Sequence, residues 1–478
     1  MNRKTLKADL CVIGAGAAGL VSSGGAAMLG RKVVLFEAAE MGGDCLNFGC
    51  VPSKAILAAA HAAHGIRSAA KFGVTAGEPH INFTAVMDHV RAAIAAIEPN
   101  DSQERFEKLG VTVIRERAAF TGPATVQSDS VTVAAKRFVI ATGTRTRIPH
   151  MPGLADISYL TSETIWTLTA LPSHLFIIGG GPIGCELGQA FARLGSKVTI
   201  LEANRLLGGF EPEHVDTLRE ALAADGVRVI EGCGVERFEQ HGADIAITLP
   251  DEEKLTASHV LVAAGRVPVF DGLGLEAAGI ETGPAGIVCD DRLRTSNRRV
   301  YAAGDIAGKG ALTHLAGWHG VVILRNLYFG LPTKQSSSPV PRCVYTQPGL
   351  ARIGLTESEA RARHGKAVSV RRSPFHENDR AVTEGDTAGE VKLILGKGGK
   401  VLGAHVAGAR ADDIIQYVSV VMSKGGTAGD LSGPVLAYPT RGEALKQAAF
   451  EHFEPVVFGP FSKALARLFS ALHGFALR

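Results

Sequence analysis

The chain has 478 residues, of which 57 are glycine, and 46% of its residues are hydrophobic. This composition excludes a disordered chain, and the net charge of +3 is too balanced to indicate nucleic acid or an anionic membrane as a partner. Seven cysteines are too few, and odd in number, for a disulfide-stapled secreted scaffold. At about 100–200 residues per domain, the length predicts about three domains. No apolar stretch approaches about 18 residues, so we expect no transmembrane helix and a cytoplasmic location.

The first predicted element is a short apolar strand at residues 10–13 that leads directly into a glycine-rich turn. Gly14, Gly16 and Gly19 match the pattern G-x-G-x-x-G, and a helical stretch and a strand ending in Glu37 follow. In a dinucleotide-binding unit these glycines allow the tight turn, the approach of backbone to the pyrophosphate and the packing of helix on strand. The pyrophosphate would lie at the helix N-terminus, and Glu37 would accept hydrogen bonds from ribose hydroxyls.

Two cysteines, Cys45 and Cys50, follow in the segment MGGDCLNFGCVPSKAIL. Five residues of regular helix rise about 7.5 Å, whereas disulfide-bonded Cα atoms are rarely more than about 7 Å apart. A bridge therefore requires a distorted turn, which the neighbouring glycines allow. Pro52 suits the first turn of a helix, which would place Cys50 near a helix N-terminus with Lys54 one turn on. Both effects lower the pKa of a thiol and favour the thiolate.

Local chemistry leaves three interpretations of this pair open: a redox pair, two unpaired thiols in a loop, or half of a metal site. The spacing C-x4-C is not a common zinc spacing, and no second cluster of Cys and His completes four ligands, so we expect no metal. Buried cysteines act more often as small hydrophobic residues than as catalysts. We assign that structural role to Cys11, Cys185, Cys233, Cys289 and Cys343.

The glycine unit occurs a second time, 165 positions further along the chain. A strand leads into Gly179, Gly181 and Gly184, and a second strand ends in Glu202. Two such units predict two dinucleotides, and a flavin with a nicotinamide is the chemically sensible pair because hydride passes from one ring to the other. An acidic Glu202 favours a free 2′-hydroxyl, hence NADH over NADPH, although Arg205 lies nearby.

At this point the sequence resembles a known family, the flavin-dependent pyridine nucleotide–disulfide oxidoreductases, which include dihydrolipoamide dehydrogenase and mercuric reductase. The segment GGDCLNFGCVPSK resembles the active-site segment of the family. The resemblance covers nearly the whole chain. It continues at 138–149 and 300–314 (two FAD segments), at 260–268 (the end of the NAD domain) and at 344–357 (the start of the dimerisation domain).

The resemblance implies an α/β fold with two Rossmann-like dinucleotide-binding domains, for FAD and NAD(P), and an α+β dimerisation domain. We expect an FAD-binding domain at 1–150 and 280–340, interrupted by an NAD(P)-binding domain at 151–279. An interface domain at 341–455 and an amphipathic helical tail at 456–478 follow. A homodimer is expected, because the family's C-terminal catalytic residues reach the active site of the other subunit.

The resemblance also implies roles for individual residues. Cys45 would be the outer thiol that exchanges with substrate, and Cys50 the inner thiol next to the flavin. Lys54 would pair with Glu186 near the flavin N5, and Asp305 would bond the ribityl chain. Further cofactor-binding positions implied by the family's motifs are Gly43, Ala119, Thr142, Gly143, Ile183, Gly265, Arg266, Leu312, Thr313 and His314.

The segment LAYPTRGEALKQ departs from the family's pattern at one position. Glu443 is retained, but Tyr438 stands where the disulfide reductases carry the His that acts as acid and base. A tyrosine, with a pKa near 10, is a poor base at pH 7, so dihydrolipoamide oxidation is in doubt. A tyrosine here resembles mercuric reductase, yet the vicinal cysteines at the C-terminus of that enzyme are missing from this sequence.

The function we expect is an FAD-dependent NAD(P)H:disulfide oxidoreductase, with NADH as the first choice of reductant. Electrons would pass through FAD to the disulfide of Cys45 and Cys50, and on to an unidentified small-molecule or protein acceptor of the thiol/disulfide type. The alternatives are reduction of Hg(II), and direct reduction of a quinone or oxygen by the flavin with the cysteines as a sensor. A redox-regulated binding protein that uses the tail is the alternative outside enzymes.

The tail carries apolar residues at helical spacing, which are Phe461, Leu465, Leu468, Phe469 and Leu472. We expect this helix to pack on the dimer, and a weak contact with a membrane surface or with a partner protein is the alternative.

Overall fold

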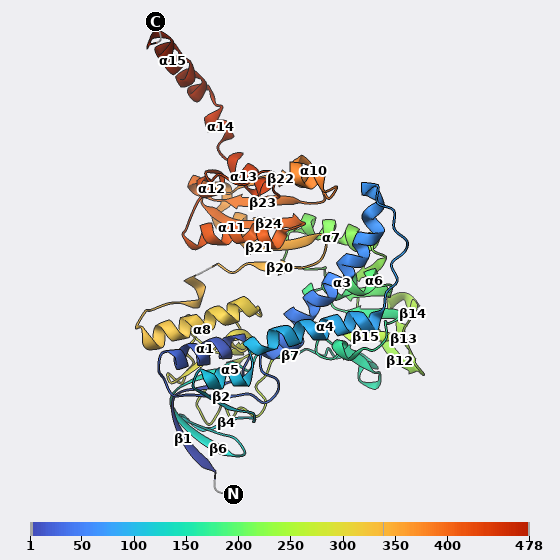
Figure 1. Ribbon diagram of the computed structural model, residues 1–478, viewed down its shortest axis with the longest axis vertical. Helices are drawn as coiled ribbons and strands as arrows, with labels where there is room; N and C mark the ends of the chain where they lie inside the picture. The colour runs from blue at the N-terminus through green and yellow to red at the C-terminus, as the bar shows by residue number, and fades with distance from the viewer. Residues whose placement is uncertain (1–2, 338, 477–478) are drawn as a thin grey trace. The chain divides into compact units, whose positions relative to one another are not determined.

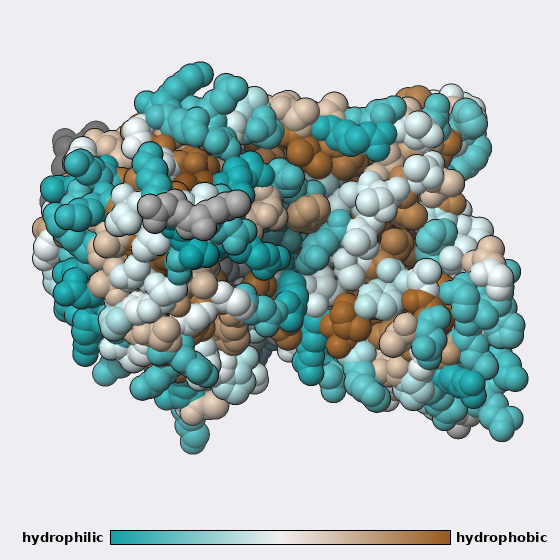
Figure 2. Space-filling view, turned by 90° about the horizontal axis from the view of Figure 1, so that it is seen from below, coloured by the Kyte–Doolittle hydropathy of each residue, from teal (hydrophilic) through white to brown (hydrophobic). Residues whose placement is uncertain are grey.

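The computed structural model describes residues 3–337 and 339–476 and contains two compact units (Figure 1). The first unit comprises Met1–Leu206 and Asp225–Ser337, and the second comprises Leu207–Ala224 and Ser338–Arg478. In the described part of the chain, no helix combines the length and the apolar character needed to cross a bilayer. Figure 2 shows one face of the molecule, on which hydrophilic residues prevail and apolar residues form scattered patches.

The first sheet has seven strands in the order β3-β2-β1-β6-β5-β4, with β19 paired to β6. The pairings among β3, β2, β1, β6 and β19 are parallel, and those of β4 with β5 and of β5 with β6 are antiparallel. The bounds are β1 (Lys4–Ile13), β2 (Val33–Phe36), β3 (Val111–Ile114), β4 (Ala119–Gly122), β5 (Thr125–Gln127), β6 (Val131–Ile140) and β19 (Val300–Ala302).

The strand expected at residues 10–13 is the buried end of a longer strand. β1 begins at Lys4 because its first half pairs residue by residue with β6, from Lys4 with Val131 to Ala8 with Ala135. The helices that follow in the same unit include α1, which packs against α8. Their bounds are α1 (Ala17–Met28), α2 (Gly43–Asn47), α3 (Cys50–Ser68), α4 (Phe83–Ile97), α5 (Gln103–Lys108) and α8 (Thr313–Tyr328).

The second sheet of this unit has five parallel strands in the order β11-β10-β9-β15-β8. The helix α6 (Pro182–Arg193) connects β9 to β10, as α1 connects β1 to β2. The parallel strands of these two sheets, with helices between them, agree with the predicted α/β class. The bounds are β8 (Tyr159–Thr161), β9 (His174–Ile178), β10 (Lys197–Glu202), β11 (Val227–Glu231) and β15 (His259–Val262), with antiparallel strands β12 (Arg237–His241), β13 (Asp244–Thr248) and β14 (Lys254–Ala257) and the pair β7 (Thr144–Thr146) and β16 (Arg266–Pro268).

The turns after β1 and β9, together with the helices that follow them, admit only glycine at two positions in each copy. Gly14 has φ +103°, and a Cβ there would lie 2.4 Å from the carbonyl oxygen of Ala141. A Cβ on Gly19 would lie 1.8 Å from the carbonyl oxygen of Gly14. The same contact recurs in the second copy, at 1.9 Å between Gly184 and Gly179. The helix after each glycine turn therefore packs so closely against that turn that no side chain fits between them.

The second unit is built on an antiparallel sheet in the order β20-β21-β24-β23-β22. Apolar residues of β23 and β24 form a buried core with residues of α11 and α13. The strands are β20 (Arg342–Val344), β21 (Gly349–Gly354), β22 (Ser369–Pro374), β23 (Glu390–Leu395) and β24 (Val401–Gly408), and the helices are α7 (Pro212–Ala224), α9 (Glu357–His364), α10 (Asp379–Thr383), α11 (Ala411–Ser423), α12 (Ala428–Ser432), α13 (Glu443–Phe450), α14 (Glu454–Val457) and α15 (Pro460–Ala476).

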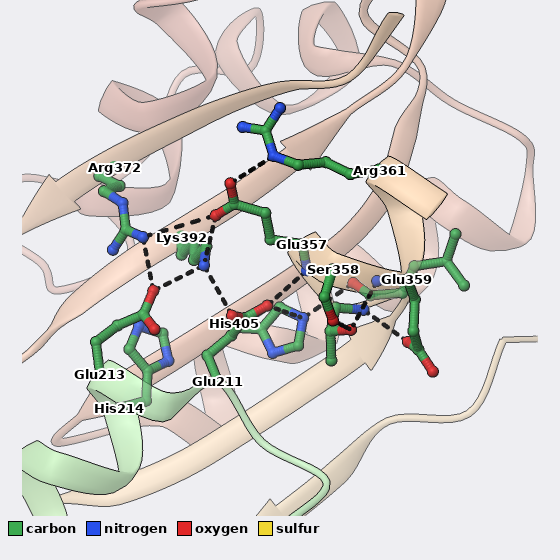
Figure 3. A network of polar contacts seen from close by, with 12 residues as sticks. Glu211, Glu213, His214, Glu357, Ser358, Glu359, Arg361, Arg372, Lys392 and His405 are labelled. Atoms are coloured by element: carbon green, nitrogen blue, oxygen red, sulfur yellow. Dashed lines mark hydrogen bonds and ion pairs between the residues drawn. The ribbon is translucent and has the colours of Figure 1, made fainter. Parts of the chain in front are cut away.

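A buried lysine holds three carboxylates together in this second unit (Figure 3). Lys392 Nζ lies 2.8 Å from Glu211, 2.7 Å from Glu213 and 2.9 Å from Glu357. Burial alone would raise the pKa of Glu213, but hydrogen bonds from Lys392 and Arg372 outweigh burial and lower the pKa to about 2. The network ties the start of α7 to the sheet. It explains why residues 207–224, which the sequence places inside the nicotinamide domain, pack with the second unit.

Replacing Lys392 with Met is expected to lower the free energy of unfolding by about 3 kcal/mol at pH 7, because the carboxylates lose their shared buried cation. The pKa of Glu213 lies below its ordinary value of 4.5, so its stabilising contribution is present above pH 4.5 and is lost as the pH falls towards 2. The difference in the free energy of unfolding between Lys392→Met and wild type should therefore become smaller as the pH falls over that range. Urea unfolding followed by circular dichroism measures this difference. Lys366→Met, at an exposed cation of the same unit, is the control. Equal stability of Lys392→Met and wild type at pH 7 would contradict this account.

Candidate active site

The two cysteines lie at a break between two helices. Cys45 is in α2, and Cys50 is the first residue of α3. The carbonyl oxygen of Asp44 accepts hydrogen bonds from the backbone N–H groups of both Phe48 and Gly49, which turns the chain between the helices. The five residues from Cys45 to Cys50 therefore do not form a regular helix. A disulfide between the two cysteines requires such a break. Both cysteines are free thiols in this structure, and their side chains are hydrogen-bonded to each other.

The environment of the pair favours the thiolate on Cys50. The hydrogen bond from Cys45 lowers the pKa of Cys50 to about 6 against the effect of burial, with help from the Thr313 hydroxyl and the charge of Lys54. The Cys50 Sγ lies 3.3 Å from the Thr313 Oγ1. The same hydrogen bond, together with burial, raises the pKa of Cys45. At pH 7 the reduced pair therefore holds a thiolate at Cys50 and a thiol at Cys45.

The exposure of the two thiols differs from the sequence expectation. Cys50, assigned as the inner thiol, is the more exposed residue, and Cys45, assigned as the outer thiol, is half-buried. The expectation took Cys50 to be covered by a flavin ring, which the polypeptide does not itself supply.

An ion pair connects the helix of the cysteines with the second dinucleotide unit. Lys54 Nζ in α3 lies 2.8 Å from Glu186 Oε2 in α6. The Glu186 side chain is only 6% exposed, whereas Lys54 is 37% exposed. A buried carboxylate requires a cation or hydrogen-bond donors, which Lys54 provides here. The structure therefore brings together Cys50, Lys54 and Glu186 from two helices that are far apart in sequence.

A second polar chain leads from Asp305 to the residue before Cys45. Thr144 Oγ1 donates a hydrogen bond to Asp305 Oδ2 at 2.9 Å, and Arg266 Nε donates to Thr144 Oγ1 at 2.8 Å. Arg266 also lies 3.2 Å from Asp44 Oδ1. Burial raises the pKa of Asp305, with the hydrogen bond from Thr144 acting against it. Sequence reasoning missed Thr144 and Asp44, although both stand beside residues of the motifs it used.

The acids that end the second strands occupy equivalent positions in the two copies. The carboxylate of Glu37, and likewise that of Glu202, accepts two backbone N–H bonds, which fix it beside the glycine turn. The donors are Ala15 (2.6 Å) and Ala39 (2.7 Å) to Glu37, and Gly180 (2.8 Å) and Asn204 (2.9 Å) to Glu202. Backbone N–H groups therefore orient each carboxylate. The donors in the second copy also lie 165 residues after those in the first copy.

The two glycine turns fit the pyrophosphate of a dinucleotide. α1 begins after Gly16 and α6 begins after Gly181, and neither N-terminus receives a side-chain cap. A Cβ added to Gly16 or Gly181 would meet no atom within 4 Å. Each turn therefore combines uncapped N–H groups with open space, which is the arrangement that binds phosphate at a helix N-terminus. The residues present accordingly fit FAD at the first turn and a nicotinamide dinucleotide at the second.

The other expected cofactor positions lie around these elements. A Cβ on Gly43 would lie 2.8 Å from the Cα of Gly16, so α2 begins in contact with the first turn. The Thr142 hydroxyl donates a hydrogen bond to the carbonyl oxygen of Val269 at 3.1 Å. Gly143 and Gly265 have positive φ angles of +66° and +98°. The remaining positions are Ala119 in β4, Ile183 in α6, Leu312 at the N-cap of α8 and the exposed His314 in the first turn of α8.

The residues expected from the C-terminal motif lie in the second unit. The Tyr438 hydroxyl donates a hydrogen bond to Asp379 Oδ2 at 2.8 Å, and this bond raises the pKa of Tyr438. Glu443 Oε2 accepts from the backbone N–H of Thr440 at 3.0 Å at the start of α13. Tyr438 is therefore a neutral hydrogen-bond donor at pH 7 and does not act as a base there.

The remaining cysteines are separate from this chemistry. Burial raises the pKa of Cys11 and of Cys185, as expected for small buried side chains. Burial also raises the pKa of Cys289. Across residues 3–337 and 339–476, no three His, Cys, Asp or Glu side chains are grouped so that they could hold a metal ion.

Two family descriptions match most of the sequence. "Pyridine nucleotide-disulphide oxidoreductase" matches residues 8–320, and the dimerisation domain of the same family matches residues 340–449. The chain belongs to the pyridine nucleotide-disulphide oxidoreductase family. The predicted recognition, the α/β fold with a dimerisation domain and the oxidoreductase class are thereby confirmed, and FAD with NAD(P)H are the cofactor and reductant of the family.

Individual members of the oxidoreductase family are similar to this chain over almost their full length. A mercuric reductase of Streptomyces lividans is 37% identical, over 92% of this chain and 95% of that protein. A dihydrolipoyl dehydrogenase of Chlorobaculum parvum is 35% identical, over 92% of this chain and 96% of that protein. The structure of the HOCl-induced flavoprotein disulfide reductase RclA from Escherichia coli, at 27% identity, covers 92% of this chain and 99% of its own with a TM-score of 0.83.

Alkylation of the reduced enzyme by iodoacetamide, with peptide mapping to assign the modified residue, should show Cys50 reacting with a midpoint near pH 6. The thiolate is the reactive form, and the Cys45 hydrogen bond and the Lys54 charge both favour it. Lys54→Met should move the midpoint up by about one unit. Lys71→Met, at an exposed cation of the same unit, should leave it unchanged. A wild-type midpoint near the ordinary value of about 8.5 would contradict the assignment.

Proposed function

We propose that the protein passes two electrons from NAD(P)H, through FAD and the Cys45–Cys50 pair, to an acceptor of the thiol/disulfide type. The observation that carries this proposal is the position of Cys45 and Cys50 on either side of the break between α2 and α3, with the Lys54–Glu186 ion pair one turn along α3 from Cys50. When bound, FAD supplies two-electron transfer between the nicotinamide and the cysteines.

The reduced pair can exchange with a disulfide acceptor without an added base. Cys50 holds the charge and accepts a hydrogen bond from Cys45, so transfer of that proton to Cys50 produces a nucleophilic thiolate at Cys45. Attack on the acceptor forms a mixed disulfide and releases one acceptor thiol. Attack of Cys50 on Cys45 then forms the Cys45–Cys50 disulfide and releases the second thiol. The pair supplies two electrons and one proton to the acceptor, and the second acceptor thiolate takes its proton from water.

The state of Tyr438 favours reduction of an acceptor over oxidation of a dithiol. Oxidising a dithiol requires a group that removes protons from the substrate near pH 7. The phenol of Tyr438 donates to Asp379, and that hydrogen bond raises its pKa. A phenol can still donate a proton or a hydrogen bond to a leaving thiolate. The chain therefore operates from NAD(P)H towards the acceptor.

Reduction of Hg(II) is the second candidate. It is supported by the mercuric reductase of Streptomyces lividans, which is 37% identical and is covered over 95% of its length. Two adjacent cysteine sulfurs are soft ligands that suit a soft metal ion as substrate. The alternative with a quinone or oxygen would need the flavin but not the cysteines.

We further propose NADH as the preferred reductant and a homodimer as the working unit. Glu202 at the end of β10 disfavours the 2′-phosphate of NADPH by charge. The dimerisation domain at 340–449 supports self-association, and α11 in that domain exposes Tyr417 and Val420, at 55% and 57%.

Turnover with a disulfide, with Hg(II) and with a quinone should separate these candidates. Wild type, Cys45→Ser and the control Cys233→Ser are compared with NADH and with NADPH. The proposal predicts that Cys45→Ser loses at least about 100-fold of its kcat on the disulfide acceptor, because nucleophilic exchange requires that thiol. The turnover rate of Cys233→Ser should match that of wild type. Turnover with NADH should be faster than turnover with NADPH.

Full turnover of a quinone by Cys45→Ser, with no disulfide or Hg(II) reduction by wild type, would contradict the proposal and favour direct use of the flavin. Turnover of Hg(II) alone, lost in Cys45→Ser, would identify the second candidate.

A further inference from the structure

The C-terminal helix α15 presents an exposed apolar face. Its large apolar residues follow the spacing i, i+4, i+7, i+8 and i+11, which places them on one side of a helix. Phe461 is 79% exposed and Leu468 is 56% exposed. The full set is Phe461, Leu465, Leu468, Phe469 and Leu472, and the preceding turn adds Val456, Val457 and Phe458, all exposed. Exposed apolar surface of this extent on one short segment indicates an interaction site.

The opposite side of α15 carries only positive charge. Lys463 and Arg467 are four residues apart, and at 100° per residue they lie across the helix from Leu465 and Leu472. No Asp or Glu occurs after Glu454 in the sequence. The helix therefore combines an apolar side with a cationic side and offers no carboxylate to a basic partner.

The helix also lies outside the redox machinery. The match to the dimerisation domain ends at residue 449, eleven residues before α15 begins at Pro460. None of the residues placed at the active site belongs to α15. Figure 1 shows α14 and α15 leading away from the sheet of the second unit. Neither the fold of the family nor the electron-transfer chemistry accounts for the apolar side of this helix.

We propose that α15 binds the surface of an anionic lipid bilayer. The helix lies in the plane of the interface, with its apolar side in the acyl region and Lys463 and Arg467 at the lipid headgroups. Its 17 residues are about 25 Å long, too short to cross a hydrocarbon core of about 30 Å but sufficient to lie along it. Charge favours this occupant over a second copy of α15, which would bring the same cations and no acidic residue.

Sedimentation of the full-length holoenzyme with vesicles tests this proposal. One set of vesicles contains phosphatidylcholine and phosphatidylglycerol, and the other contains phosphatidylcholine alone. Binding to the anionic set should be about 25-fold stronger, because each of the two cations contributes roughly 5-fold near an anionic surface. The advantage should disappear at high salt and in the double variant Lys463→Gln/Arg467→Gln.

Phe469→Glu is expected to weaken binding at least about 10-fold, because it places a charge in the apolar side. Its matched control is Phe72→Glu, at a phenylalanine of similar exposure (58% against 51%) in the first unit. Lys366→Gln/Lys424→Gln, at two exposed cations of the second unit, is the control for charge. Both controls should bind like wild type, and NADH oxidation in solution should be the same in all variants.

Absence of binding, or equal binding to the two sets of vesicles, would overturn the proposal. A change of oligomeric state in Phe469→Glu, measured by analytical ultracentrifugation without any loss of vesicle binding, would overturn it in favour of a second copy of the chain as the occupant.

Discussion

The ion pair between Lys54 and Glu186 is the contact on which the arrangement of the site depends. It joins α3, which begins with Cys50, to α6, which begins at the second glycine turn. Glu186 is buried, so loss of Lys54 would remove the cation that pairs with this carboxylate in the interior. The same lysine lowers the pKa of Cys50 through its charge. One side chain therefore links the packing of the two dinucleotide units to the chemistry of the thiol.

The duplicated turns impose a similar constraint on the backbone. In each copy the helix approaches the turn so closely that a Cβ on Gly19 or Gly184 would overlap a carbonyl oxygen. This approach sets the uncapped N-terminus of the helix at the carboxyl end of the parallel strands, where dinucleotides bind in such sheets. The carboxylates of Glu37 and Glu202 are held there by the backbone in the same way. The glycine excess of the composition thus has a structural basis at these positions.

Sequence reasoning predicted the parts of the molecule that depend on local patterns. The strands, the glycine turns and the helix with Pro52 in its first turn follow from short-range spacing, and the family was recognised from the cysteine segment. Contacts between distant residues were not visible in the same way. The bond of Tyr438 to Asp379 spans 59 residues, and the link of Thr144 to Asp305 spans 161. The position of residues 207–224 depends on the buried Lys392, which no local pattern marks as an anchor.

The central claim is that electrons from the nicotinamide reach the Cys45–Cys50 pair. The most direct measurement is a count of thiols, made in denaturant, on the oxidised holoenzyme before and after anaerobic addition of NADH. The account predicts that wild type gains two thiols per chain, because one disulfide is reduced by two electrons. Cys45→Ser and Cys50→Ser should gain none. An unchanged count in wild type whose flavin has been bleached by NADH would contradict the account.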